Sequence, residues 1–229
     1  MASMLKKVFD ALLRAYKHQG WWPLITMANQ PGFDERGYHP KSYTFPKTPE
    51  QALEVCIGAI LTQNTSWRNV EAVVKNLAQR GLLNRDKLLA LPLPKLGELI
   101  RQSGYYNQKA KKIKAFLNYN GPTTREGLLS VWGVGPETVD SMLLYAYHKP
   151  VFVVDAYTKR ILSRLGIVNR DAKYNQIQDL FHESLPREEW LYNEYHALLV
   201  EHAKQHCKKK PECNGCPLLK LCRFAEKQL

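Results

Sequence analysis

This chain of 229 residues lacks the sequence features of membrane-spanning, secreted, strand-rich and repeat proteins. No apolar run approaches the ~20 residues that a membrane span needs, and the N-terminus has no apolar signal-peptide core. There is no alternating polar and apolar pattern of the kind that predicts strands, and no repeat with a period of ~20–50 residues. We therefore expect an all-α, cytoplasmic protein that is not a solenoid and has no membrane partner.

Acidic side chains are scarce relative to basic ones. The chain has 21 Asp and Glu against 33 Lys and Arg, which gives a formal net charge of +12. In a folded domain, such an excess indicates a polyanionic partner, foremost nucleic acid. Charge alone does not separate DNA from RNA or from an acidic membrane. The hydrophobic fraction of 45% is typical of a globular protein, and the length allows one domain or two small lobes.

Cysteine is also rare, with five in the chain, but four of them stand close together in the pattern C-x5-C-x2-C-x5-C. These four are Cys207, Cys213, Cys216 and Cys222. In a reducing compartment a disulfide framework is disfavoured, so the pattern indicates metal ligation. Zinc sites usually show two C-x2-C pairs and this run has one, yet zinc stays open. Cys56 lies on an apolar helical stripe and is expected to be an inert core residue.

Two glycines stand where a ligand can approach the backbone, in the turn Trp132-Gly133-Val134-Gly135 between two predicted helices. Glycine permits close approach, and N–H groups at a helix N-terminus bind phosphate. The turn alone is equally consistent with an ordinary helix–helix connection. A hydrophobic run follows it, and Asp155 comes 22 residues after Gly133, at the start of a further predicted helix.

The strings VWGVGPETV and VVDAYTKR, at this interval, resemble the helix-hairpin-helix DNA glycosylases of the endonuclease III superfamily. That family has a hairpin of the form LPGVGxKTA, then a hydrophobic run and an aspartate. AILTQNTSW and SGYYNQKAKKIKAF resemble two further family segments, and the cysteine run resembles its iron–sulfur loop, although the first interval has five residues where six is usual. The resemblance implies two helical lobes. One is a bundle of residues 46–153 ending in the hairpin, and the other joins residues 1–45 to 154–229.

The resemblance also implies a role for each matched residue. Asp155 is the carboxylate beside the sugar of an extruded nucleotide, a role compatible with its being a helix N-cap, since capping donors keep an aspartate ionised. Gln63 enters the DNA stack at the gap that the nucleotide leaves. The other DNA-contacting candidates are Gly133, Val134, Gly135, Lys208, Lys209 and Lys210. The four clustered cysteines hold a 4Fe–4S cluster, with zinc as the alternative.

The most informative departure from the family pattern is Glu137. In GVGxKTA a lysine attacks the sugar and forms a Schiff base, which leads to strand cleavage. This chain has GVGPET, and a carboxylate cannot form an imine. The resemblance therefore implies a monofunctional glycosylase that leaves an abasic site. Glu137 is the second catalytic candidate, although an acid in the first turn of a helix is also favourable by itself.

Aromatic residues near the N-terminus bear on which base is removed. Trp21-Trp22-Pro23, with Phe45 and Glu137, most resembles the bacterial 3-methyladenine glycosylases of the superfamily. We expect Trp22 and Phe45 to stack on a cationic alkylated purine, with Trp21 behind them. A Trp pair before proline is otherwise a common core element.

Other functions remain open at this point. They are an endonuclease III-like enzyme, a mismatch glycosylase for uracil, thymine or adenine, and a non-catalytic DNA-binding relative. In each case the expected partner is double-stranded DNA. The expected state is a monomer, associated with the nucleoid if the source is bacterial or archaeal.

Overall fold

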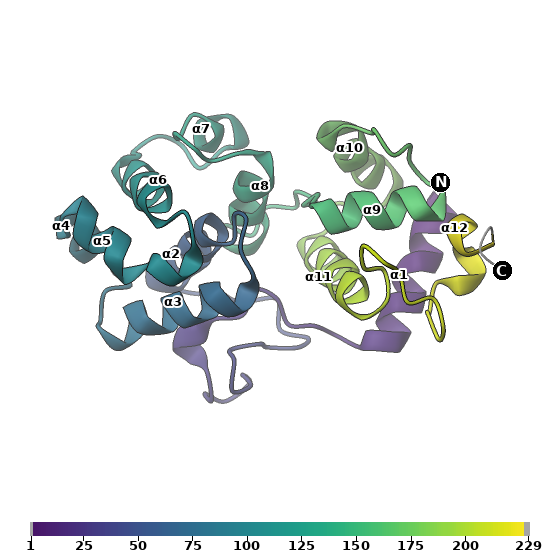
Figure 1. The fold of residues 1–229 in the computed structure, drawn as a ribbon, viewed down its shortest axis with the longest axis horizontal. Helices are drawn as coiled ribbons and strands as arrows, with labels where there is room; N and C mark the ends of the chain where they lie inside the picture. The colour runs from purple at the N-terminus through teal and green to yellow at the C-terminus, as the bar shows by residue number, and fades with distance from the viewer. Residues whose placement is uncertain (1, 227–229) are drawn as a thin grey trace. The chain divides into compact units, whose positions relative to one another are not determined.

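The computed structural model describes residues 2–226, and every regular element in this range is helical (Figure 1). The predicted all-α class is therefore confirmed. Within the described residues, no helix is both long enough and apolar enough to cross a bilayer.

The chain folds as two compact units, one of Met1–Trp21 with Pro150–Leu229 and the other of Trp22–Lys149. We refer to them as the terminal unit and the central unit. The prediction had placed residues 22–45 with the chain ends, and the structure instead joins them to the central unit. The reason is a buried acid: Glu54 is 2% exposed and accepts hydrogen bonds from the N–H groups of Ile25 and Thr26.

The central unit is built around α2, which is buried along most of its length and packs against α3, α6 and α8. Its apolar side chains, such as Val55, Ile57 and Ile60, are fully buried. The elements of this unit are η1 (Ile25–Met27), α2 (Pro49–Leu61), α3 (Trp67–Gln79), α4 (Arg85–Ala90), α5 (Leu93–Leu99), η2 (Arg101–Ser103), α6 (Tyr106–Asn118), α7 (Arg125–Leu129) and α8 (Pro136–Tyr145).

The terminal unit is organised around α11, which packs against α1 and α9. Its core is aromatic: the rings of Phe152 and Phe181 stack at 3.5 Å between centroids, and Tyr195 meets both rings edge-on. The elements of this unit are α1 (Ala2–Tyr16), α9 (Ala156–Leu165), α10 (Tyr174–Ser184), α11 (Glu189–Gln205), η3 (Leu219–Leu221) and α12 (Arg223–Glu226).

Side chains cap the two helix starts that flank the hairpin and the apolar run. The hydroxyl of Thr124 accepts from the N–H of Gly127 at 3.1 Å, and the carboxylate of Asp155 caps α9. Ser66 occupies the N-cap of α3, but its side chain makes no capping hydrogen bond. The hairpin between α7 and α8, and the start of α9, therefore lie where the sequence predicted them.

Candidate active site and nucleic-acid interface

Asp155 is held at the start of α9 by its own helix. Its Oδ1 atom accepts a hydrogen bond from the N–H of Thr158 at 2.7 Å, and its side chain is 12% exposed. The preceding apolar residues Phe152, Val153 and Val154 are buried, which anchors the chain just before the carboxylate. The capping role predicted for Asp155 is confirmed.

A histidine that the sequence analysis did not single out approaches the second oxygen of this carboxylate. The Nε2 atom of His196, on α11, lies 3.7 Å from Oδ2 of Asp155. Burial raises the pKa of the Asp155 carboxyl, but the imidazole of His196 and the N–H of Thr158 outweigh burial, so this pKa lies below its ordinary value. A carboxylate with this pKa is an anion at neutral pH and suits the stabilisation of positive charge.

Trp21 also lies at this site. Its ring meets the imidazole of His196 edge-on, with 5.8 Å between centroids, and the ammonium of Lys204 lies 5.8 Å from the centre of its indole ring. The backbone carbonyl of Trp21 accepts from the amide of Asn193 at 2.8 Å. Within the terminal unit, the structure thus brings together an acid, an imidazole and an indole.

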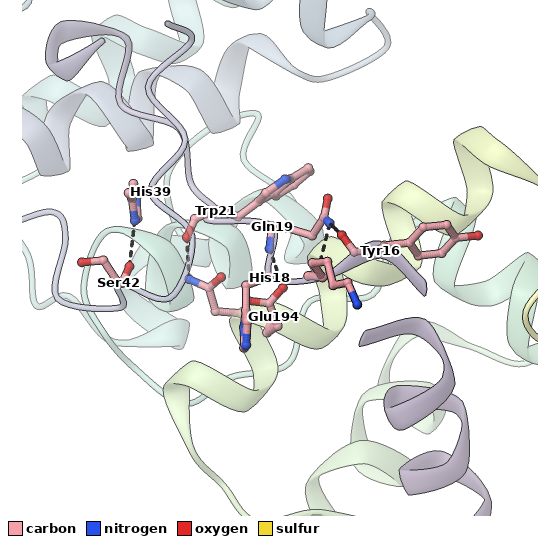
Figure 2. A network of polar contacts seen from close by, with 9 residues as sticks. Tyr16, His18, Gln19, Trp21, His39, Ser42 and Glu194 are labelled. Atoms are coloured by element: carbon pink, nitrogen blue, oxygen red, sulfur yellow. Dashed lines mark hydrogen bonds and ion pairs between the residues drawn. The ribbon is translucent and has the colours of Figure 1, made fainter. Parts of the chain in front are cut away.

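The segment before Trp21 is tied to α11 by a buried acid. Glu194 is fully buried, accepts from the N–H of Gln19 at 2.7 Å and lies 3.2 Å from the imidazole of His18 (Figure 2). The amide of Gln19 also donates to the carbonyl of Tyr16 at 2.8 Å, which fixes the chain as it leaves α1. These contacts set the position of Trp21.

Trp22 belongs to the core of the central unit, which corrects its predicted role as the stacking surface for a base. It is 7% exposed, and its ring lies 5.3 Å from the rings of Trp67 and Tyr145. Its carbonyl lies 2.9 Å from Nε2 of His39.

Phe45 is half-buried among aromatic neighbours of the central unit. Its ring meets Phe33 edge-on at 4.7 Å and lies 5.6 Å from His39. The ammonium of Lys47 lies 4.5 Å from the ring centre, a cation–π contact. A face of Phe45 is thus already in contact with a cation.

The hairpin exposes its backbone as predicted. Gly133 has a φ of +78°, in the left-handed region that favours glycine, and Val134 is buried at 6% exposure, which anchors the turn. Gly135 is exposed at the N-cap of α8, and no atom lies within 4 Å of where its Cβ would be. Trp132 is 56% exposed beside them. The N-terminus of α8 is therefore open to a phosphate.

Gln63 lies against this hairpin within the central unit. Its side-chain amide donates to the hydroxyl of Thr138 at 3.0 Å and to the carbonyl of Gly133 at 3.5 Å, and its Oε1 accepts from Lys112. The two elements that the sequence assigned to DNA therefore lie together. The entry of Gln63 into a DNA stack stays a prediction, and it requires these bonds to break.

Three of the four lysines between residues 109 and 114 contact other parts of the chain, whereas Lys111 is exposed. Lys109 is 2% exposed and donates to the carbonyls of Leu61 and Ser103. Lys112 contacts Gln63, and Lys114 donates to three carbonyls at the end of α4. These three lysines therefore connect α6 to the ends of neighbouring elements.

Glu137 is exposed in the first turn of α8. Its backbone carbonyl accepts from the hydroxyl of Ser141 at 2.7 Å. An acid at this point interacts favourably with the helix dipole. The structure therefore supports a helix-stabilising role and leaves the catalytic role of Glu137 a prediction.

The four C-terminal cysteines line one pocket, together with residues of α9 and α11. Arg164 of α9 donates to Sγ of Cys207 at 3.2 Å and to the carbonyl of Lys208 at 2.6 Å, and Arg160 donates to the carbonyl of Cys207 at 2.8 Å. Across residues 2–226, no three His, Cys, Asp or Glu side chains converge to metal-binding geometry. The thiols thus surround a shared volume without converging on one point, and four sulfur donors suit an iron–sulfur cluster or zinc.

Some residues around this pocket already make polar contacts within the protein. His202 is 2% exposed, and its Nδ1 atom lies 3.0 Å from the hydroxyl of Tyr16. Lys208 pairs with Glu212 at 2.7 Å, whereas Lys209 and Lys210 are exposed. The last two are the better candidates for phosphate contacts.

The chain is similar in sequence to known DNA-repair proteins. A family model described as HhH-GPD superfamily base excision DNA repair protein matches residues 57–187, a range that contains the hairpin and Asp155. A protein of Methanocaldococcus jannaschii, named as a candidate DNA repair glycosylase, is 43% identical over 235 residues, which cover 96% of each chain.

Solved structures with the same fold include two DNA-repair enzymes. An endonuclease III trapped as a covalent intermediate with DNA matches with a TM-score of 0.76 and 24% identity, over 100% of this chain and 98% of that chain. The 3-methyladenine DNA glycosylase of H. pylori, bound to 1,N6-ethenoadenine, matches with a TM-score of 0.65 and 27% identity, over 88% of this chain and 97% of that chain. These matches confirm the predicted fold.

Proposed function

The chain belongs to the HhH-GPD superfamily of base excision DNA repair proteins, and we infer that it is a monofunctional DNA N-glycosylase that removes alkylated purines. The observation that carries this proposal is the largely shielded Asp155 at the start of α9, whose pKa lies below its ordinary value, with the imidazole of His196 beside it and Trp21 against that imidazole. DNA docking by itself requires no such carboxylate, which argues against a non-catalytic relative.

The chemistry assigned to Asp155 is electrostatic. A glycosylase extrudes one nucleotide and breaks the bond between base and sugar, and positive charge develops on the sugar as the base departs. A fixed anion beside the sugar lowers this barrier and can also orient a water molecule. Because the Asp155 pKa is below its ordinary value, this carboxyl is suited to act as an anion and not as a proton donor.

Glu137 is the reason for proposing base removal without strand cleavage. It occupies the position at which the family pattern has the lysine that forms a Schiff base, and a carboxylate cannot form one. The rival is a bifunctional glycosylase and lyase, and the similarity in fold to an endonuclease III trapped covalently on DNA keeps that rival open. A covalent trapping experiment separates the two.

The proposed substrate class is a purine that carries a positive charge from alkylation. The ring of Phe45 in the central unit and the ring of Trp21 in the terminal unit each have a lysine ammonium within cation–π distance. Each such contact contributes roughly 0.5–2 kcal/mol. A cationic base can take the place of the ammonium group on such a ring face. The likeness to a 3-methyladenine glycosylase supports the same class.

Both units carry groups suited to hold duplex DNA. The exposed amides of Gly133 and Gly135 and the N-terminus of α8 suit a phosphate, and Lys209 and Lys210 extend the basic surface. We propose that Cys207, Cys213, Cys216 and Cys222 hold a 4Fe–4S cluster, with zinc as the alternative. Such a group would fix the loop that bears these lysines. Purification without air, followed by measurement of iron, sulfide and zinc, decides between the two.

The test of the proposed function is a panel of duplexes that contain alkylated, deaminated or oxidised bases. Free bases are identified after incubation, and borohydride is added in parallel to trap any imine between protein and DNA. We expect release of alkylated purines and no trapped adduct. A trapped adduct would establish the lyase, and exclusive release of uracil, thymine or an oxidised base would overturn the substrate assignment.

A further inference from the structure

A buried histidine accompanies the carboxylate to which we assign the chemistry. His196 is 5% exposed, and its Nε2 atom lies 3.7 Å from Oδ2 of Asp155. The other carboxylate oxygen accepts from the N–H of Thr158 at 2.7 Å. One oxygen is therefore held by the helix that Asp155 begins, and the other is approached by a side chain of a second helix.

The groups that face His196 come from the elements packed around α11. This helix packs against α1 and α9, and α9 contributes Asp155, the titratable group beside the imidazole. From the segment after α1, the ring of Trp21 meets the imidazole edge-on at 5.8 Å. Glu194, a buried acid on α11 itself, binds Gln19 and His18 instead. Asp155 is therefore a charged group that the structure places beside the imidazole.

We propose that His196 is a positioning residue for Asp155, whose imidazole donates toward Oδ2 and holds the carboxylate in the orientation that faces the sugar. The inference rests on the proposed glycosylase function, which it deepens. A carboxylate fixed through one oxygen still pivots about that bond, and a donor on the second oxygen removes this freedom. A donor beside the anion also favours the ionised form, in the same direction as the low pKa of Asp155.

The first arm of the test measures base release in single turnovers. His196→Phe keeps the ring and removes the donor, whereas His196→Gln keeps an N–H donor of similar reach. We expect His196→Phe to lower the rate on the order of 10- to 100-fold, with DNA affinity little changed, because a displaced catalytic group costs that much. His196→Gln should recover most of the rate.

The second arm does not depend on activity. Carboxyl 13C NMR titration follows the ionisation of Asp155, with its resonance assigned by comparison with Asp155→Asn. In His196→Phe the titration of Asp155 should move to higher pH, and the acid limb of the rate profile should move with it. If the wild-type protein releases no base, the proposed function fails, and the NMR arm still decides whether His196 acts on Asp155.

The matched control is His18→Gln, which removes a histidine that contacts another acid of α11, Glu194. Its thermal unfolding is compared with that of the His196 variants, and its Asp155 titration should equal that of the wild type. The inference is overturned if His196→Phe, folded as judged by circular dichroism, keeps both the wild-type rate and the wild-type titration. It is equally overturned if His196→Gln is as slow as His196→Phe.

Discussion

The two adjacent tryptophans differ in their surroundings, and only one of them belongs to a core. Trp21 is half-buried beside His196, whereas Trp22 is 7% exposed among Trp67 and Tyr145. The structure therefore gives Trp22 a packing role in the central unit, and we propose a ligand-binding role for Trp21.

Alanine substitution should separate these two tasks. Trp22→Ala removes a buried indole and should lower the free energy of unfolding by about 3–5 kcal/mol, as measured by urea denaturation. Trp21→Ala should leave stability nearly unchanged while it weakens binding of duplexes that contain an alkylated purine, relative to undamaged duplex. If Trp21→Ala lowered stability and Trp22→Ala weakened only binding, the assignment of Trp21 to the site would be wrong.

The sequence was sufficient to find Asp155, because an aspartate before a helical pattern and after an apolar run has both a local and a family signature. It was not sufficient to find His196, which is distant in sequence and meets Asp155 only because α11 packs on α9. The same limit applies to the burial of Lys109, because the carbonyl of Leu61 becomes its neighbour only after the central unit has folded.

At the scale of elements, the hairpin before α8 is the part that local chemistry specifies best. Gly133 has a positive φ, and a Cβ at this position would lie 2.8 Å from Cγ of Lys112. At Gly135, φ is −97° and an added Cβ meets nothing within 4 Å. A methyl group would therefore clash with Lys112 at Gly133, whereas it would meet no obstacle at Gly135.

Gly133→Ala should distort the hairpin, since a left-handed conformation costs a non-glycine residue roughly 1–2 kcal/mol and Lys112 must also move. We expect lower stability and weaker DNA binding by fluorescence anisotropy. Gly135→Ala is the matched variant, and its stability should stay within about 0.5 kcal/mol of the wild type. Equal losses of stability in both variants would contradict this account of the turn.

The boundary of residues 22–45 is the element-scale feature that the sequence did not reveal. This segment is rich in loop-forming residues, so no periodicity indicated which unit it joins. Its attachment depends on the buried Glu54, which accepts from the N–H of Ile25. Inside the segment, His39 lies within hydrogen-bonding distance of the carbonyl of Ser42 (Figure 2). Such interactions form only in the folded chain, so no local sequence pattern predicts them.

For the whole molecule, the net charge of +12 predicts binding to DNA that weakens with salt. Removing one ion pair between a lysine and a phosphate reduces the slope of log affinity against log salt by about 0.9. The double variant Lys209→Ala with Lys210→Ala should therefore show a smaller slope, by about 2, on any duplex sequence. Lys95→Ala, which removes a lysine paired with Glu98, should leave the slope unchanged.

The central claim is that the Asp155 carboxylate drives base release from DNA held by the rest of the protein. Its most direct measurement compares the wild type with Asp155→Asn in single-turnover base release and in binding to the same alkylated duplex. Asn keeps the shape and a capping oxygen but removes the charge. We predict that base release is abolished while binding stays within a few-fold of the wild type. Base release at the wild-type rate, or parallel loss of release and binding, would contradict the claim.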